Sequence, residues 1–154
     1  IADNHAFVWD RTRPDASLLA LLANPDYAPI VVFPQQYAEA GRCINSPLEL
    51  VAVQNGKIPL FIMLDGTWRE AKKMFKSPYL ATLPVLGIQP EQGSCYQLRE
   101  AAHLHQLCTA EVAIEVLKLA QDTAAASALA EYFAVFRRAY IVGKPHLNFT
   151  ESAE

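Results

Sequence analysis

The stretch from residue 58 to residue 77 constrains the fold more than any other part of the chain, because a strand, a tight turn and a helix follow one another there. The apolar run Pro59–Leu64 is too short for a helix and has the composition of a strand buried on both faces. A turn follows at Gly66. Thr67 and Glu70 then have the spacing of a capping box, which predicts Thr67 as the N-cap of a helix. The segment is therefore half of a βαβ unit.

This turn places polar groups where α/β proteins bind ligands. Asp65 and Thr67 follow the predicted strand at its carboxyl end, and the helix N-terminus beside them favours carboxylate or phosphate. Asp65 has two readings, a functional carboxylate or an Asx-turn residue that helps the chain reverse, and spacing does not separate them. Trp68 also has two: its spacing to Ala71 and Phe75 predicts a core residue, while an indole at a helix start can stack on a base.

The predicted helix has a basic face. Arg69, Lys72, Lys73 and Lys76 are spaced so that they fall together, and they are four of the 13 Lys and Arg residues in a chain of net charge −3. On an arbitrary helix, a solvated surface explains such a stripe. Beside a ligand crevice in an acidic chain, the stripe favours a polyanion as the partner.

The remaining pattern alternates strands with helices, which predicts an α/β fold with a mostly parallel sheet and helices on both faces, in three layers. Residues 35–55 read mostly as loop with a short helix near 48–53, and residues 96–106 show no clear period. The other expected elements are strands over 6–9, 30–33 and 84–88, and helices over 18–22, 109–121 and 124–140. The last helix is expected to bury Leu129, Phe133 and Phe136.

Length and composition fit a single domain. The 154 residues contain no repeat and no linker, and no apolar run approaches the ~20 residues of a membrane helix. Cys43, Cys95 and Cys108 are an odd, scattered set without a C-x-x-C pair. They predict reduced thiols in a cytoplasmic protein and no zinc site.

Several short motifs resemble the DTW-domain family, the tRNA-uridine aminocarboxypropyltransferases. Asp65-Gly66-Thr67-Trp68 is similar to the D-x-T-W signature, and Cys108-Thr109-Ala110-Glu111 to the family's S-T-x-E element. Further matches in order and spacing are Arg11-Thr12-Arg13-Pro14, Phe33-Pro34, Leu98-Arg99 and Gly143-Lys144-Pro145-His146-Leu147. The resemblance covers nearly all of residues 1–154 and implies one DTW domain. The family's cysteine cluster ahead of the core is missing, so an absent N-terminal segment is expected, and a structural metal in it stays open.

The resemblance implies transfer of the 3-amino-3-carboxypropyl group of S-adenosylmethionine to N3 of a tRNA uridine, with release of 5′-methylthioadenosine. tRNA and S-adenosylmethionine are then the expected partners, with no metal in this stretch, no membrane and no protein partner. A SPOUT-like fold is implied as well, and with it a deep knot that nothing in the sequence pattern shows. The alternatives are a non-catalytic RNA-binding module and a SPOUT-like RNA methyltransferase that uses S-adenosylmethionine.

The site residues follow from these motifs. Catalytic candidates are Asp65, Thr67 and Trp68. Cofactor-binding candidates are Pro34, Leu64, Gly66, Val85, Leu86, Gly87, Arg99, Thr109 and Glu111. RNA-binding candidates are Arg11, Arg13, Arg69, Lys72, Lys73 and Lys76. Glu111 is either a cofactor contact or a first-turn carboxylate that complements its helix dipole. Arg99 either holds a phosphate or the cofactor carboxylate, or is an exposed surface arginine.

Overall fold

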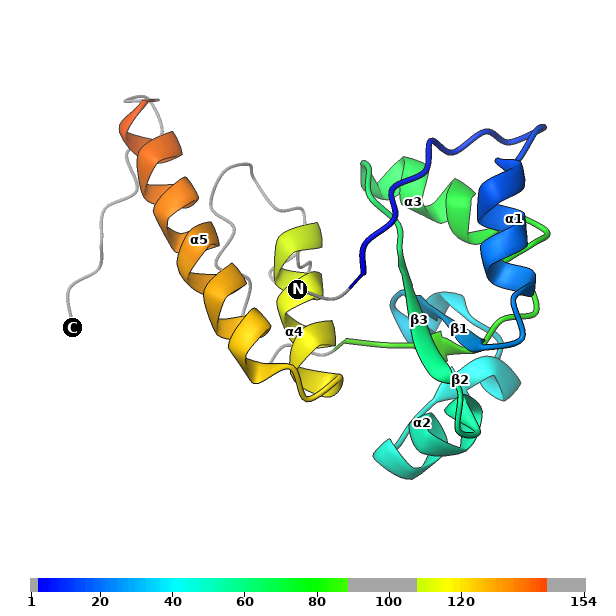
Figure 1. The fold of residues 1–154 in the computed structure, drawn as a ribbon. Helices are drawn as coiled ribbons and strands as arrows, with labels where there is room; N and C mark the ends of the chain where they lie inside the picture. The colour runs from blue at the N-terminus through cyan, green and yellow to red at the C-terminus, as the bar shows by residue number, and fades with distance from the viewer. Residues whose placement is uncertain (1–2, 89–107, 144–154) are drawn as a thin grey trace. The chain divides into compact units, whose positions relative to one another are not determined.

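The computed structural model describes residues 3–88 and 108–143 of the chain (Figure 1). The chain divides into two compact units, residues 1–88 and residues 89–154. The first unit contains the sheet and the first three α-helices, and the second contains a pair of helices.

The first unit is built on a four-stranded parallel sheet with the order β2–β4–β1–β3. The strands are β1 (Tyr27–Val32), β2 (Cys43–Ile44), β3 (Ile58–Met63) and β4 (Val85–Leu86). The register pairs Val32 of β1 with Met63 on one side and with Leu86 on the other. Among the described residues, every strand of this sheet is parallel to its neighbours, which confirms the predicted α/β class.

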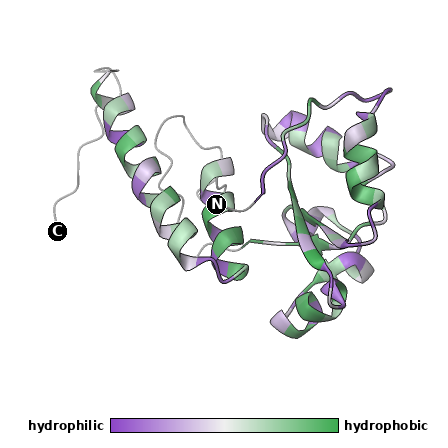
Figure 2. Cartoon of the chain, viewed as in Figure 1, coloured by the Kyte–Doolittle hydropathy of each residue, from purple (hydrophilic) through white to green (hydrophobic). Residues whose placement is uncertain are grey.

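Helices cover both faces of the sheet, as predicted. They are α1 (Ala16–Ala23), α2 (Pro47–Gln54) and α3 (Trp68–Phe75). On one face, Val31 and Val85 pack with Phe75 of α3, and Leu22 of α1 joins them. On the other face, Ile30 and its neighbours pack with Leu50 of α2. Adjacent residues of β1 therefore face opposite helical layers, and the strands are correspondingly hydrophobic in Figure 2.

The strand after Lys57 is an edge strand, so the prediction that it is buried on both faces is wrong. In the order of the sheet, β3 pairs with β1 alone, and Ile58 and Met63 are 59% and 37% exposed. The central strand is β1, whose Ile30 and Val31 are completely buried. A continuous apolar run marks a strand with hydrophobic neighbours but does not tell the centre of a sheet from its edge.

Residues 6–9 are not a strand, contrary to the prediction. The segment from Asp3 to Pro14, here called the N-terminal arm, has no sheet pairing, and Val8 is almost fully exposed. It is attached through a side chain: the Trp9 indole Nε1 donates a hydrogen bond of 3.1 Å to Oγ of the buried Ser77, just beyond α3. The apolar run at residues 6–9 therefore includes a docking residue, Trp9, and does not form a strand.

The stretch after β1 contains more structure than the sequence indicates. Two 3-10 helices, η1 (Gln35–Tyr37) and η2 (Ala40–Arg42), precede the two-residue strand β2. The expected short helix is present as α2. Ser46 caps it by accepting a hydrogen bond from Glu49 N, and Asn55 ends it in the left-handed region at φ 47°.

The second unit contains α4 (Thr109–Leu119) and α5 (Thr123–Val142), which pack against each other. Both were predicted. Ile114, Val116 and Ala126 are buried there, whereas Phe136, expected in the core, is 48% exposed. None of the described helices combines the length and apolar composition needed to cross a bilayer. The segment 96–106 lies outside the described residues.

The central position of β1 gives a stability prediction. Ile30→Ala should lower the free energy of unfolding by about 2–5 kcal/mol, because it leaves a cavity between two packed layers. The matched control is Ile58→Ala on β3, where the side chain is 59% exposed and the loss should be much smaller. Urea unfolding followed by circular dichroism measures both. Equal losses would contradict a central β1 and a peripheral β3.

Candidate functional site

Three neighbouring strands end together at one edge of the sheet. Val32 lies opposite both Met63 and Leu86, so the residues that follow, Phe33, Leu64 and Gly87, lie next to one another in register. The Phe33 amide donates a hydrogen bond of 3.1 Å to the Leu86 carbonyl and continues the pairing past the strand. The predicted cofactor positions at Pro34, Leu64, Gly66 and Gly87 are thus brought to one edge, here called the carboxyl edge.

The turn after β3 leads into a capping box, as predicted. The Glu70 amide donates to Thr67 Oγ1 at 3.3 Å, and the Thr67 amide donates to Glu70 Oε2 at 2.9 Å. The Thr67 hydroxyl also donates to Glu70 Oε2, at 2.6 Å. The hydroxyl proton of Thr67 is therefore engaged in a hydrogen bond within the cap. These hydrogen bonds from Thr67, together with the Lys73 ammonium, hold the pKa of Glu70 below its ordinary value.

Gly66 lies close to the side chain of Glu70 in the same arrangement. A Cβ atom at Gly66 would lie 3.3 Å from both Cβ and Oε2 of Glu70, so the glycine leaves space for the Glu70 side chain to fold back. Asp65 precedes it and is exposed at the carboxyl edge. An exposed residue at this position is accessible to a ligand.

Trp68 begins α3 and packs inward. It is half-buried against the cluster of Val31, Phe33 and Phe75, and its ring centroid is 5.8 Å from that of Phe33. Phe33 also stacks on Phe75 at 4.5 Å. These contacts favour the core reading of Trp68, in which the indole forms a wall beneath the carboxyl edge.

The end of β4 is a tight corner. The side chains of Val85 and Leu86 are buried on opposite faces, so only their backbone can reach a ligand at the edge. The Gln35 side chain lies over Gly87, where an added Cβ would be 2.8 Å from Gln35 Cγ. Gln35 Nε2 donates a hydrogen bond of 2.7 Å to the Ile44 carbonyl and so links η1 to β2.

The basic face of α3 is exposed. Arg69, Lys72, Lys73 and Lys76 all project from it, and in the described part of the chain none of them lies within 4 Å of a carboxylate. Lys72 contacts an aromatic ring instead, with Nζ 4.8 Å from the centroid of Tyr37. Hydrophilic stretches along α3 are visible in Figure 2.

Arg11 and Arg13 are exposed in a turn of the N-terminal arm. Asp10 organises this turn, since its Oδ1 accepts hydrogen bonds from the amides of Arg13 and Thr12 at 2.8 and 2.7 Å. These bonds lower the pKa of Asp10. The two guanidinium groups are left to solvent.

The sequence of the chain matches a known protein family over most of its length. Residues 1–141 match the model of the DTW domain. The chain belongs to the DTW-domain family. This family includes tRNA-uridine aminocarboxypropyltransferases, and membership is consistent with a tRNA-modifying role and with tRNA as a substrate. No solved structure matches the chain.

The second half of the DTW match contains the remaining candidates. Thr109 is the first residue of α4, and Glu111 Oε2 accepts a hydrogen bond of 2.9 Å from the Cys108 amide, so Cys108 is the N-cap. Burial raises the pKa of the Cys108 thiol. Thr109 and Glu111 belong to the second unit, whereas Asp65 belongs to the first. Arg99 lies outside the described residues.

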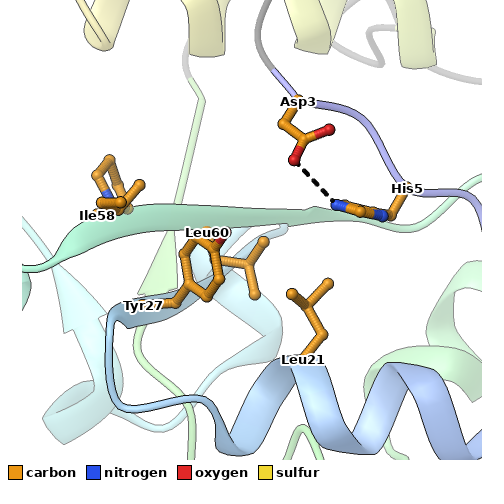
Figure 3. Close-up of a pocket in the computed structure, with 7 residues that line it drawn as sticks. Asp3, His5, Leu21, Tyr27, Ile58 and Leu60 are labelled. Atoms are coloured by element: carbon orange, nitrogen blue, oxygen red, sulfur yellow. Dashed lines mark ion pairs between the residues drawn. The ribbon is translucent and has the colours of Figure 1, made fainter.

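A cavity of about 250 Å³ lies at the opposite end of the sheet (Figure 3). It is lined by Tyr27 and Ile58, which begin β1 and β3, by Leu21 of α1, and by Asp3 and His5 of the N-terminal arm. Asp3 and His5 form an ion pair at 3.4 Å. This cavity is therefore separate from the carboxyl edge. Within the described ranges, no three His, Cys, Asp or Glu residues are grouped so as to hold a metal ion.

Two residues at the carboxyl edge of the DTW domain were not predicted. Gln35 covers Gly87, and Tyr37 joins the aromatic cluster with its ring centroid 5.6 Å from that of Phe33. The Gln36 side chain and the Lys72 ammonium lower the pKa of the Tyr37 phenol. The one feature of the sequence that could have indicated Gln35 and Tyr37 is their position just after Pro34, close to the end of a predicted strand.

The capping box gives a pH prediction. The pKa of Glu70 is lowered in the folded state, so its charged form stabilises the fold above the unfolded pKa of ~4.3, and this is lost as pH falls through the lowered value. Glu70→Gln should therefore reduce Tm at neutral pH, and the difference from the parent should shrink on acidification towards about pH 3. Glu131→Gln, an exposed position on α5, is the control. A difference that stays constant across this range would exclude the charged cap as its source.

Proposed function

We propose that this DTW domain transfers the 3-amino-3-carboxypropyl group of S-adenosylmethionine to N3 of a uridine in tRNA, releasing 5′-methylthioadenosine. The observation that supports the proposal most directly is the exposed carboxylate of Asp65 at the carboxyl edge, next to a cationic helix. Open α/β sheets bind ligands at this edge. Membership of a family that includes such transferases supplies the choice of reaction.

The residues at the carboxyl edge suit this donor chemically. Asp65 offers a negative charge to a sulfonium and an α-ammonium group, and Leu64 and the backbone around Pro34 and Gly87 offer an apolar surface for a nucleoside. One side chain must move: a nucleoside placed against Gly87 requires Gln35 to turn away and give up its hydrogen bond to the Ile44 carbonyl. Gln35 is half-buried in a 3-10 turn, so a rotamer change is sufficient.

S-adenosylmethionine, when bound, supplies electrophilic carbons beside its sulfonium. The protein selects the carbon that faces N3 and holds the uridine in line with it, and positioning of this kind provides most of the expected rate. The N3 proton must leave as the N–C bond forms. Asp65 is the proposed acceptor or orienting group. Thr67 and Trp68 have supporting roles. Thr67 fixes the start of α3, and Trp68 supports the wall of the site.

The RNA is proposed to bind along α3. Its four cations are exposed and have no carboxylate partner in the described structure, so binding tRNA phosphates breaks no ion pair. Arg11 and Arg13 of the N-terminal arm would extend this surface, since Trp9 anchors the arm just beyond α3. The same cations also favour the second candidate, an RNA-binding module without catalysis.

A labelling experiment separates these candidates. The protein is incubated with a total tRNA pool and with S-adenosylmethionine labelled either in the carboxyl group or in the methyl group. Carboxyl label in the tRNA is expected. Methyl label would indicate a methyltransferase, and tRNA binding without either label would indicate the non-catalytic module.

Asp65→Asn is the matched variant in this assay. It keeps the size of the side chain and removes the charge and the proton acceptor, so transfer should fall by about 10²–10⁴-fold while tRNA binding persists. Asp26→Asn, at the amino end of the sheet ahead of β1, should retain full transfer. Full activity of Asp65→Asn would remove Asp65 from the mechanism.

The cationic surface is tested by Lys73→Gln combined with Lys76→Gln. If both contact phosphates, the slope of log affinity against log salt should decrease by about two, one for each lost cation. The control is Lys57→Gln, at the amino end of β3. Filter binding of tRNA between about 50 and 200 mM salt gives the slopes. An unchanged slope would assign the α3 lysines to a merely solvated face.

A further inference from the structure

Tyr37 is an exposed aromatic side chain at the carboxyl edge. It ends η1, and its amide donates a hydrogen bond of 3.1 Å to the carbonyl of Pro34, the N-cap of that turn. Its ring lies 5.6 Å from the Phe33 ring at an interplanar angle of 49°, and Phe33 is itself held by Phe75. Even so, 40% of Tyr37 is exposed. The ring is therefore fixed by the core and accessible to a ligand at the same time.

Lys72 is the second component. Its ammonium lies 4.8 Å from the centroid of the Tyr37 ring, and no carboxylate of the described chain pairs with it. An exposed cation–π contact of this type favours the arrangement with the ammonium over the ring by about two- to fivefold. Stacking of a nucleobase on an aromatic ring is worth about five- to 150-fold. A base can therefore displace the ammonium, whose flexible stem then lets it reach a phosphate.

We infer that Tyr37 and Lys72 form a nucleotide subsite, in which the ring stacks on an RNA base and the ammonium pairs with an adjoining phosphate. The inference rests on the proposed function for the identity of the RNA. Because η1 follows β1 and Asp65 follows the adjacent β3, the subsite holds a nucleotide near the modified uridine. Stacking needs a base that is free of its own helix, so the substrate is an unpaired or loop region of tRNA.

The experiment measures binding of a total tRNA pool, without S-adenosylmethionine, at several salt concentrations. Tyr37→Leu should weaken binding at least fivefold with an unchanged salt slope, whereas Tyr37→Phe should stay within twofold of the parent. Lys72→Gln should reduce the salt slope by about one. The control Tyr132→Leu, at a 73% exposed tyrosine on α5, should leave binding unchanged.

Direct evidence for stacking comes from Tyr37→Trp. Its added indole fluorescence should be quenched when tRNA binds, beyond the quenching of the parent, and this readout does not depend on whether Tyr37→Leu folds. Binding of folded Tyr37→Leu within twofold of the parent overturns the inference. So does a Tyr37→Phe variant as weak as Tyr37→Leu, because the hydroxyl would then be the relevant group. Absence of extra quenching in Tyr37→Trp overturns it as well.

These outcomes are separable from the proposed reaction. Carboxyl label transferred by the parent, with binding independent of Tyr37, would remove the subsite and leave the transferase. Binding that depends on Tyr37, with no label transferred, would remove the transferase and leave the subsite.

Discussion

Parallel pairing of β1 with strands on both of its sides determines where everything else lies. Parallel neighbours cannot be joined by tight hairpins, so the chain leaves the sheet after each strand and returns along a crossover. Those crossovers supply α2 and α3, one to each face. The same pairing aligns the ends of β1, β3 and β4, so that Pro34, Asp65 and Gly87, remote in sequence, converge on one edge. The candidate site is a consequence of this topology.

Local signals in the sequence were sufficient for the elements that stabilise themselves locally. The Thr67–Glu70 capping box and the helix after Pro47 depend on neighbours in sequence, and both were predicted. The strand expected over 30–33 was recognised from its apolar composition and is part of β1. The errors concern long-range partners. Nothing within β3 distinguishes an edge from a centre, the two residues of β2 are too few for a period, and Trp9 is positioned by Ser77, 68 residues away.

The same distinction applies to the site. Asp65 and Thr67 were placed at a strand end because the strand, the turn and the cap are contiguous. Tyr37 and Gln35 were missed because their importance arises from contacts with Lys72 on α3 and Gly87 after β4. Thr67 is a motif residue with a structural role, because its hydroxyl donates a hydrogen bond to Glu70. A motif residue is thus not necessarily in contact with substrate.

Net charge is a poor guide to binding in a chain of this kind. At physiological salt, charges interact over about 8 Å, so an overall charge of −3 spread over the surface scarcely opposes a local cluster. The eight residues of α3 span only about 12 Å and include Arg69, Lys72 and Lys73, with Lys76 as the C-cap. Glu70, the one acid of the helix, is turned back to its N-terminus, where it complements the helix dipole. An acidic protein can therefore present a cationic surface beside its carboxyl edge.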